Sequence, residues 1–201
     1  MTLYRVSAEG YLARAQTQLA LGSSEALFYA AFELRACIEA RQDQYLDAQR
    51  AYARGIPRSW KIGNQRRELS RIFEGQKIQL IRIRLSSGLE TFRYIPVVPG
   101  LSKAAEQLGD VLHAQEKFRE KDDPWWLTLR EWISRIAVHA EYCCAGELLC
   151  PCLVRAGMGS LAVDLKNNLM SVLPEIRPGK TFEIQVDYKD DWLDELPSLD
   201  R

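Results

Sequence analysis

Histidine is scarce in this sequence, long hydrophobic runs are missing, and neither sign of charge is in excess. The two histidines, His113 and His139, leave few options for a histidine-based triad or metal site. The longest apolar stretch, residues 148–154, is far shorter than the roughly 20 residues that span a bilayer. No membrane partner is therefore expected. The N-terminus has no apolar signal-peptide core, which predicts a cytoplasmic protein.

Familiar enzyme motifs are also missing. The sequence has no Gly-x-Gly-x-x-Gly, P-loop, Gly-x-Ser-x-Gly or His-Glu-x-x-His pattern. Lys and Arg number 27, as do Asp and Glu, so the whole molecule has no field that favours nucleic acid. What is present is an ordinary globular composition, 47% hydrophobic and 27% charged, in a chain of 201 residues that can bury a core.

Helical periodicity dominates the first third of the chain. One amphipathic helix is predicted to open at Ser7 and to be stopped by Gly22, and Ser23 is predicted to cap a second helix that runs to about Arg54. The second helix should bury a stripe of Leu27, Ala31, Leu34 and Ile38 and expose a charged ridge of Glu33, Arg35, Glu39 and Arg41. A short helix is expected at about 64–73.

Later segments mix helices with strands. Alternation predicts a β-hairpin from residues 78–85 and 90–97, with Pro96 at a sheet edge. Ser102 is expected to cap a helix that reaches Gln115, and Asp123-Pro124 to start another that ends near Pro151. Two further strands are predicted at 161–165 and 181–188.

These elements predict an α+β, helix-dominated fold, a bundle of about four long helices with an inserted β-hairpin and additional C-terminal strands. Residues 1–156 would form the helical domain, with the hairpin inserted at about 78–97. Residues 157–201 would add strands and an acidic tail that pack on the same core.

A cluster near the end of the last predicted helix has the residue types of a zinc site. His139 and Cys143 are four residues apart on one helix face, and Cys150 and Cys152 could complete a tetrahedral set. The usual Cys-x2-Cys pairs are missing, and the alternative is that the cysteines are small hydrophobic residues in a packed helix. No cofactor is therefore expected, with zinc at these residues as the alternative.

Charge is segregated along the chain. The segment 54–93 carries ten basic and three acidic residues, with Trp60, Phe92 and Tyr94 interleaved, a pattern that suits backbone contact and base stacking on nucleic acid. The candidate contacts are Arg58, Lys61, Arg66, Arg67, Arg82, Arg84 and Arg93. The alternative is a solvated face whose charges pair with acidic residues elsewhere.

The C-terminus is acidic, with six acidic and two basic residues between Asp187 and Arg201. Trp192, Leu193 and Leu196 give it an apolar edge that could dock a partner protein. Alternatively, the tail folds back on the basic hairpin of the same chain.

Residues 27–46 (LFYAAFELRACIEARQDQYL) resemble the first long helix of HEPN-type domains, which are helical bundles of bacterial toxins and defence systems. That family cleaves RNA without metal through an Arg-x4-6-His motif. The comparable stretch here, residues 108–113, has His113 but Leu108 at the arginine position. The resemblance, over about 7–54 and 102–150, implies a related bundle in which His113 is the candidate catalytic residue.

Together these patterns predict a non-catalytic accessory or adaptor protein that acts through a protein partner or a homo-oligomer, with nucleic acid as a further partner. The resemblance adds a bacterial defence or toxin–antitoxin-like setting. Two alternatives remain. One is a HEPN-like ribonuclease whose cation comes from Arg35, Arg41 or a partner subunit, and the other is a small zinc-containing nucleic-acid-binding protein.

Overall fold

The computed structural model describes residues 6–50, 55–72, 78–84, 88–113, 117–146, 148 and 183–189. Helices dominate them, as predicted. In chain order the elements are α1 Ala8–Leu21, α2 Ser24–Arg50, α3 Ile62–Ile72, β1 Ile78–Arg84, β2 Leu89–Tyr94, α4 Pro99–Val111, α5 Trp125–Ala145 and β3 Glu183–Lys189. Within these ranges, no helix combines the length and the apolar content needed to cross a membrane. The strand predicted at 161–165 and the expected helix end at Pro151 lie outside the described residues.

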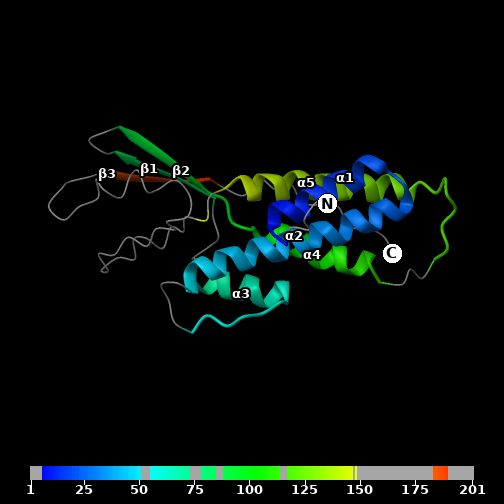
Figure 1. The fold of residues 1–201 in the computed structure, drawn as a ribbon, viewed down its shortest axis with the longest axis horizontal. Coiled ribbons are helices and arrows are strands. Elements are labelled where there is room, and N and C mark those ends of the chain that lie inside the picture. The colour runs from blue at the N-terminus through cyan, green and yellow to red at the C-terminus, as the bar shows by residue number, and fades with distance from the viewer. Residues whose placement is uncertain are drawn as a thin grey trace.

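Helix α2 is the central element, since it contacts α1, α3, α4 and α5 (Figure 1). Its predicted apolar stripe is confirmed, because Leu27, Ala31, Leu34 and Ile38 are all buried. Alanines at the contact with α1, such as Ala8, Ala15 and Ala30, are fully buried and allow the two helix backbones to approach closely. The prediction of an exposed charged ridge is wrong for Arg41, which is only 3% exposed.

The connection between α1 and α2 follows the sequence signals. The Ser7 hydroxyl accepts a hydrogen bond from Gly10 N at 3.1 Å, and Gly22 ends α1 with a left-handed φ of 69°. The Ser23 hydroxyl then accepts from Ala26 N at 3.2 Å at the start of α2. Such a short connection makes α1 and α2 neighbours along their length.

Helix α4 begins before the predicted cap. It starts at Pro99, where the missing N–H is one of the helix's unpaired donors in any case. Ser102 lies within the first turn and is fully buried. Its hydroxyl accepts a hydrogen bond from Gln42 Nε2 at 2.7 Å. The serine therefore joins α4 to α2 instead of capping α4.

Helix α5 starts at the predicted place and ends sooner than expected. Asp123 Oδ1 accepts from Trp125 N at 2.8 Å. The helix ends at Ala145, where Gly146 leaves it in an extended conformation. A Cβ at Gly146 would lie 2.7 Å from Ile95 Cβ and 3.0 Å from Ile95 N. Only glycine fits this contact without a shift of Ile95, and the helix ends six residues before Pro151, the expected end.

The strands form one antiparallel sheet in the order β2-β1-β3, and Figure 1 places it at the end of the bundle where α5 finishes. β1 pairs with β2 in the register Ile81↔Phe92 and with β3 in the register Ile81↔Val186. β2 ends at Tyr94, three residues before the predicted end. β2 is an edge strand of the sheet, but Pro96 lies beyond its end. Ile95, Pro96, Val97 and Val98 are all buried on the way to α4.

A buried arginine joins α2 to this connection and to the end of α5. Arg41 Nη2 donates to the Gly146 carbonyl and to the Tyr45 hydroxyl at 3.1 Å. The Tyr45 hydroxyl in turn donates to the Ile95 carbonyl at 2.5 Å, and burial raises the pKa of Tyr45. These bonds pair two backbone carbonyls that lie outside helices and strands, a requirement for burying irregular chain.

Tyr45→Phe should lower the free energy of unfolding by about 1–3 kcal/mol, because Arg41 and the Ile95 carbonyl each lose a buried partner. Urea unfolding measures the change. Tyr29→Phe, the same chemical change on a side chain that is 61% exposed, should stay within about 0.5 kcal/mol of the parent protein. Equal effects of the two substitutions would contradict the role of the Tyr45 hydroxyl.

Candidate functional site: a groove on the outer face of α2

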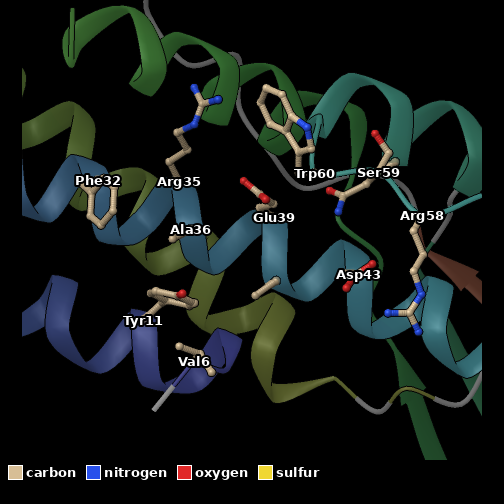
Figure 2. A pocket seen from close by; sticks show the side chains of 12 residues that line it. Val6, Tyr11, Phe32, Arg35, Ala36, Glu39, Asp43, Arg58, Ser59 and Trp60 are labelled. Carbon is tan, nitrogen blue, oxygen red and sulfur yellow. The ribbon is translucent and has the colours of Figure 1, made fainter. Parts of the chain in front are cut away.

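The α2 surface opposite the core carries a groove of about 530 Å³ (Figure 2). It lies between the N-terminal part of the chain, α2 and the segment that leads into α3. The groove is lined by Val6, Tyr11, Phe32, Arg35, Ala36, Glu39, Ala40, Asp43, Arg58, Ser59, Trp60 and Gln65. The lining changes character along α2, from apolar at Phe32 and Ala36 to acidic at Glu39 and Asp43.

Large apolar side chains line the groove but remain in solvent. Val6 is 73% exposed, Phe32 50% and Trp60 69%. Tyr29, one turn before Phe32, is 61% exposed and extends the apolar surface. Burying such side chains contributes about 1.5–3 kcal/mol each when a partner covers them, and contiguous exposed apolar surface is typical of binding sites.

Arg35 lines the groove but points away from its centre, toward α4 (Figure 2). A Cβ at Gly109 of α4 would lie only 1.8 Å from Arg35 Nη1, so the guanidinium lies where a larger residue would place its side chain. Arg58 is an ion-pair partner of Asp47, at 3.8 Å, and is 82% exposed. Two acidic side chains, Glu39 and Asp43, also line the groove, and Asp43 forms an ion pair with Arg50 at 3.3 Å.

The pKa of Glu39 is raised, first by burial of the carboxylate and then by the like charge of Asp43, and Arg35 offsets part of the effect. The pKa of Glu39 is higher in the folded chain than in the unfolded chain, so protonated Glu39 favours the folded state at low pH. This contribution to stability is lost as the pH rises through the folded-state pKa. Ionised Glu39 thus opposes folding at neutral pH. A carboxylate held under such conditions marks a candidate binding group.

The predicted nucleic-acid contacts fall into two groups. Arg58, Lys61, Arg66 and Arg67 lie in or just before α3, whereas Arg82, Arg84 and Arg93 lie on β1 and β2. Several are paired within the chain: Arg66 with Glu106 at 3.9 Å and Arg82 with Asp187. Arg67 and Arg93 are exposed. Nucleic-acid binding by these residues stays a prediction.

The acidic tail is described only at its start. Asp187 of β3 pairs with Arg82 of β1, so the first carboxylate of that segment contacts the basic hairpin. Trp192, Leu193 and Leu196, the predicted partner contacts, lie outside the described residues.

Cys143, one of the predicted zinc ligands, is buried in the core. The Cys143 thiol donates to the Ile95 carbonyl at 3.4 Å, and burial raises its pKa to about 12. A zinc ligand must be a thiolate, so this geometry does not suit Cys143 as a ligand. Cys150 and Cys152 lie outside the described residues, and no group of three or more potential ligands occurs in the part of the chain that the structure describes.

The two positions that carry the HEPN resemblance, Leu108 and His113, differ in their exposure to solvent. Leu108, at the arginine position, is fully buried in the core, whereas His113 is exposed just beyond α4. Arg41 is held by Tyr45, Gln44 and the Gly146 carbonyl and is not available to pair with a substrate at His113. Arg35 lies against Gly109, one helical turn before His113.

Sequence reasoning missed most of the groove. The sequence places Glu39 on the charged ridge of the second predicted helix and indicates no binding role for Asp43 or Phe32. One signal was present: Tyr29 and Phe32 are aromatic residues on the side of the predicted helix away from its apolar stripe. The contribution of Trp60 and Ser59 depends on how the chain returns from α2 to α3, which periodicity does not encode.

Asp43→Asn should lower the pKa of Glu39, because it removes a nearby negative charge. Carboxyl NMR titration measures the shift. Glu25, whose pKa is lowered by hydrogen bonds from its own backbone and from Ser23, is an internal reference that should titrate below Glu39. If Glu39 titrates at or below Glu25, the groove does not desolvate this carboxylate.

Comparison with known proteins gave no match: no family model, no curated protein sequence and no solved structure is significantly similar to this chain. The functional assignment therefore depends on the geometry of its own residues.

Proposed function

We propose that this protein is a non-catalytic accessory or adaptor protein, and that the α2 groove binds a segment of a partner protein. The observation that carries the proposal is the combination of exposed Phe32 and Trp60 with an acidic pair in one groove. The proposal follows the function expected from the sequence and adds a location for it. A bacterial defence setting is part of the proposal through the HEPN resemblance alone.

The chemistry of the groove favours a partner segment with a cationic side chain beside an apolar one. Glu39 and Asp43, four residues apart on α2, would bind the cation. Lys61 Nζ lies 5.5 Å from the centroid of the Trp60 ring, so this ring already contacts a cation of its own chain. A cation of the partner could contact the ring in the same way. The apolar side chain would pack on Phe32 and Ala36. The lining also includes Arg35 and Arg58, so the apolar side chains, and not the charge of the groove, favour a protein segment over nucleic acid here.

Selection of displayed peptides on the full-length protein tests this proposal. Peptides that carry Lys or Arg next to an aliphatic or aromatic residue should be enriched. Phe32→Ser should weaken a selected peptide by about 10-fold or more, since one buried anchor is worth about 1.5–3 kcal/mol. Glu39→Gln should weaken peptides with the cation and leave those without it unchanged.

Leu127→Ser is the matched control, because Leu127 is 68% exposed on α5, outside the groove. It should leave the affinity unchanged. Selection without enrichment, or peptides that bind Phe32→Ser and the parent protein equally, would contradict the groove as the binding site.

The second candidate function is a HEPN-like ribonuclease, and the position of Arg35 favours it. Its guanidinium lies against Gly109, which precedes the exposed His113 by four residues. Such a cation could stabilise charge on a scissile phosphate while the imidazole transfers a proton.

The adaptor proposal predicts that the purified protein does not cleave single-stranded RNA above background. If the protein is a HEPN-like ribonuclease, RNA cleavage should be lost in both His113→Ala and Arg35→Ala. It should be retained in Arg67→Ala, a control substitution at an exposed position of α3. Gel electrophoresis of labelled RNA measures the activity, and circular dichroism checks that each variant is folded. Cleavage with that variant pattern would replace the adaptor proposal.

A further inference from the structure

Two cysteine side chains from different helices are in contact inside the bundle. Cys37 lies on α2 and Cys144 in the last turn of α5, and their sulfur atoms are 3.8 Å apart. Both are free thiols. A disulfide needs a sulfur separation of about 2.05 Å, so a small side-chain movement would bring the sulfurs to bonding distance.

The two thiols differ in access to solvent. Cys37 is 1% exposed, whereas Cys144 is only partly buried. An oxidant from solvent would therefore reach the Cys144 sulfur first, with the Cys37 sulfur next to it on the protein side. Thiol pairs in redox-sensitive proteins share this arrangement of an accessible cysteine beside a second one that resolves it.

A buried cation lies one helical turn from Cys37. Arg41 is 3% exposed, and its closest carboxylate in the described chain, Glu9, is 3.7 Å away on a side chain that is 55% exposed. Arg41 Nε has no hydrogen-bond partner among the described residues. A guanidinium without a tightly bound carboxylate stabilises an anion such as a nearby thiolate.

Cys143, the direct neighbour of Cys144, provides an internal contrast. It is buried, and its thiol donates to the Ile95 carbonyl at 3.4 Å, with the Arg41 guanidinium beside it. The chain thus places one cysteine of an adjacent pair against a backbone acceptor and the other against a second thiol.

We propose that Cys37 and Cys144 are a peroxide-oxidisable dithiol whose disulfide joins α2 to α5. The Cys144 sulfur, after losing its proton to solvent, attacks one oxygen of hydrogen peroxide. The O–O bond breaks, the other oxygen leaves as water after protonation, and Cys144 becomes a sulfenic acid. The Cys37 sulfur then attacks the Cys144 sulfur, the S–O bond breaks, and hydroxide leaves with the Cys37 proton as water. Two thiols are oxidised by two electrons, and one peroxide is reduced to two waters.

The inference is independent of the groove, because Cys37 is on the core side of α2. The expected consequence is a higher stability of the fold. A disulfide between α2 and α5 would constrain the unfolded chain across a loop of more than 100 residues. Such a constraint raises the stability of proteins by a few kcal/mol where the native geometry accommodates the bond.

Peptide mapping of the full-length protein tests the dithiol. The reduced protein is treated with hydrogen peroxide, remaining thiols are blocked with N-ethylmaleimide, and the chain is cut with trypsin and a Glu-specific protease. Cys37 is then on fragment 36–39, Cys143 and Cys144 on 142–147, and Cys150 and Cys152 on 148–155. We expect 36–39 linked to 142–147, and loss of this species on adding dithiothreitol.

Serine variants separate the two adjacent cysteines. Cys144→Ser should abolish the linked species, whereas Cys143→Ser should retain it. The proposal is overturned if Cys37 is linked to 148–155 instead, if the link persists in Cys144→Ser, or if peroxide oxidises the cysteines of 148–155 while Cys37 remains fully alkylated. The mapping of the parent protein decides the matter even if a variant fails to fold.

Discussion

The arrangement of the described chain depends on one buried guanidinium, that of Arg41. Helix α2 can pack against four other helices only if the irregular chain around its C-terminal half is also buried and its carbonyls are paired. Arg41 pairs the Gly146 carbonyl directly and the Ile95 carbonyl through Tyr45. It thereby positions both the end of α5 and the connection from β2 to α4. Removing such a charge or its partners from a core is costly, because desolvated groups are left unpaired.

This central packing also explains why two chemically different surfaces occur on one helix. The core side of α2 carries small and aliphatic residues together with Cys37, so α5 can approach closely enough for two sulfur atoms to touch. The outer side carries Phe32, Glu39 and Asp43, which neither α1 nor α3 covers completely. The groove lies on this outer side of the 27-residue helix. The proposed binding site and the proposed dithiol are therefore on opposite sides of α2.

The burial of Leu108 bears on the proposed resemblance to HEPN-type bundles. Leu108, where that family has an arginine, belongs to the core of α4, so a charge at this position would be buried next to α2. Arg35, one of the cations expected for such a role, comes from a different helix and lies against Gly109. The binding proposal therefore depends on the geometry of the α2 groove and not on the resemblance.

The sequence alone determined the helix-dominated class, the capped turn between α1 and α2, and the buried stripe of α2, because periodicity and caps are local signals. Tertiary structure decided what local signals do not contain. Ser102 has the residue type of a cap but is buried against Gln42. Arg41 has the residue type of a surface ridge but pairs with the distant Gly146 carbonyl. Helix α5 ends before Gly146, which packs against Ile95. The groove likewise needs Trp60 to return beside Glu39. In each case the deciding partner is more than 20 residues away in the chain, and a single sequence does not state which distant residues meet.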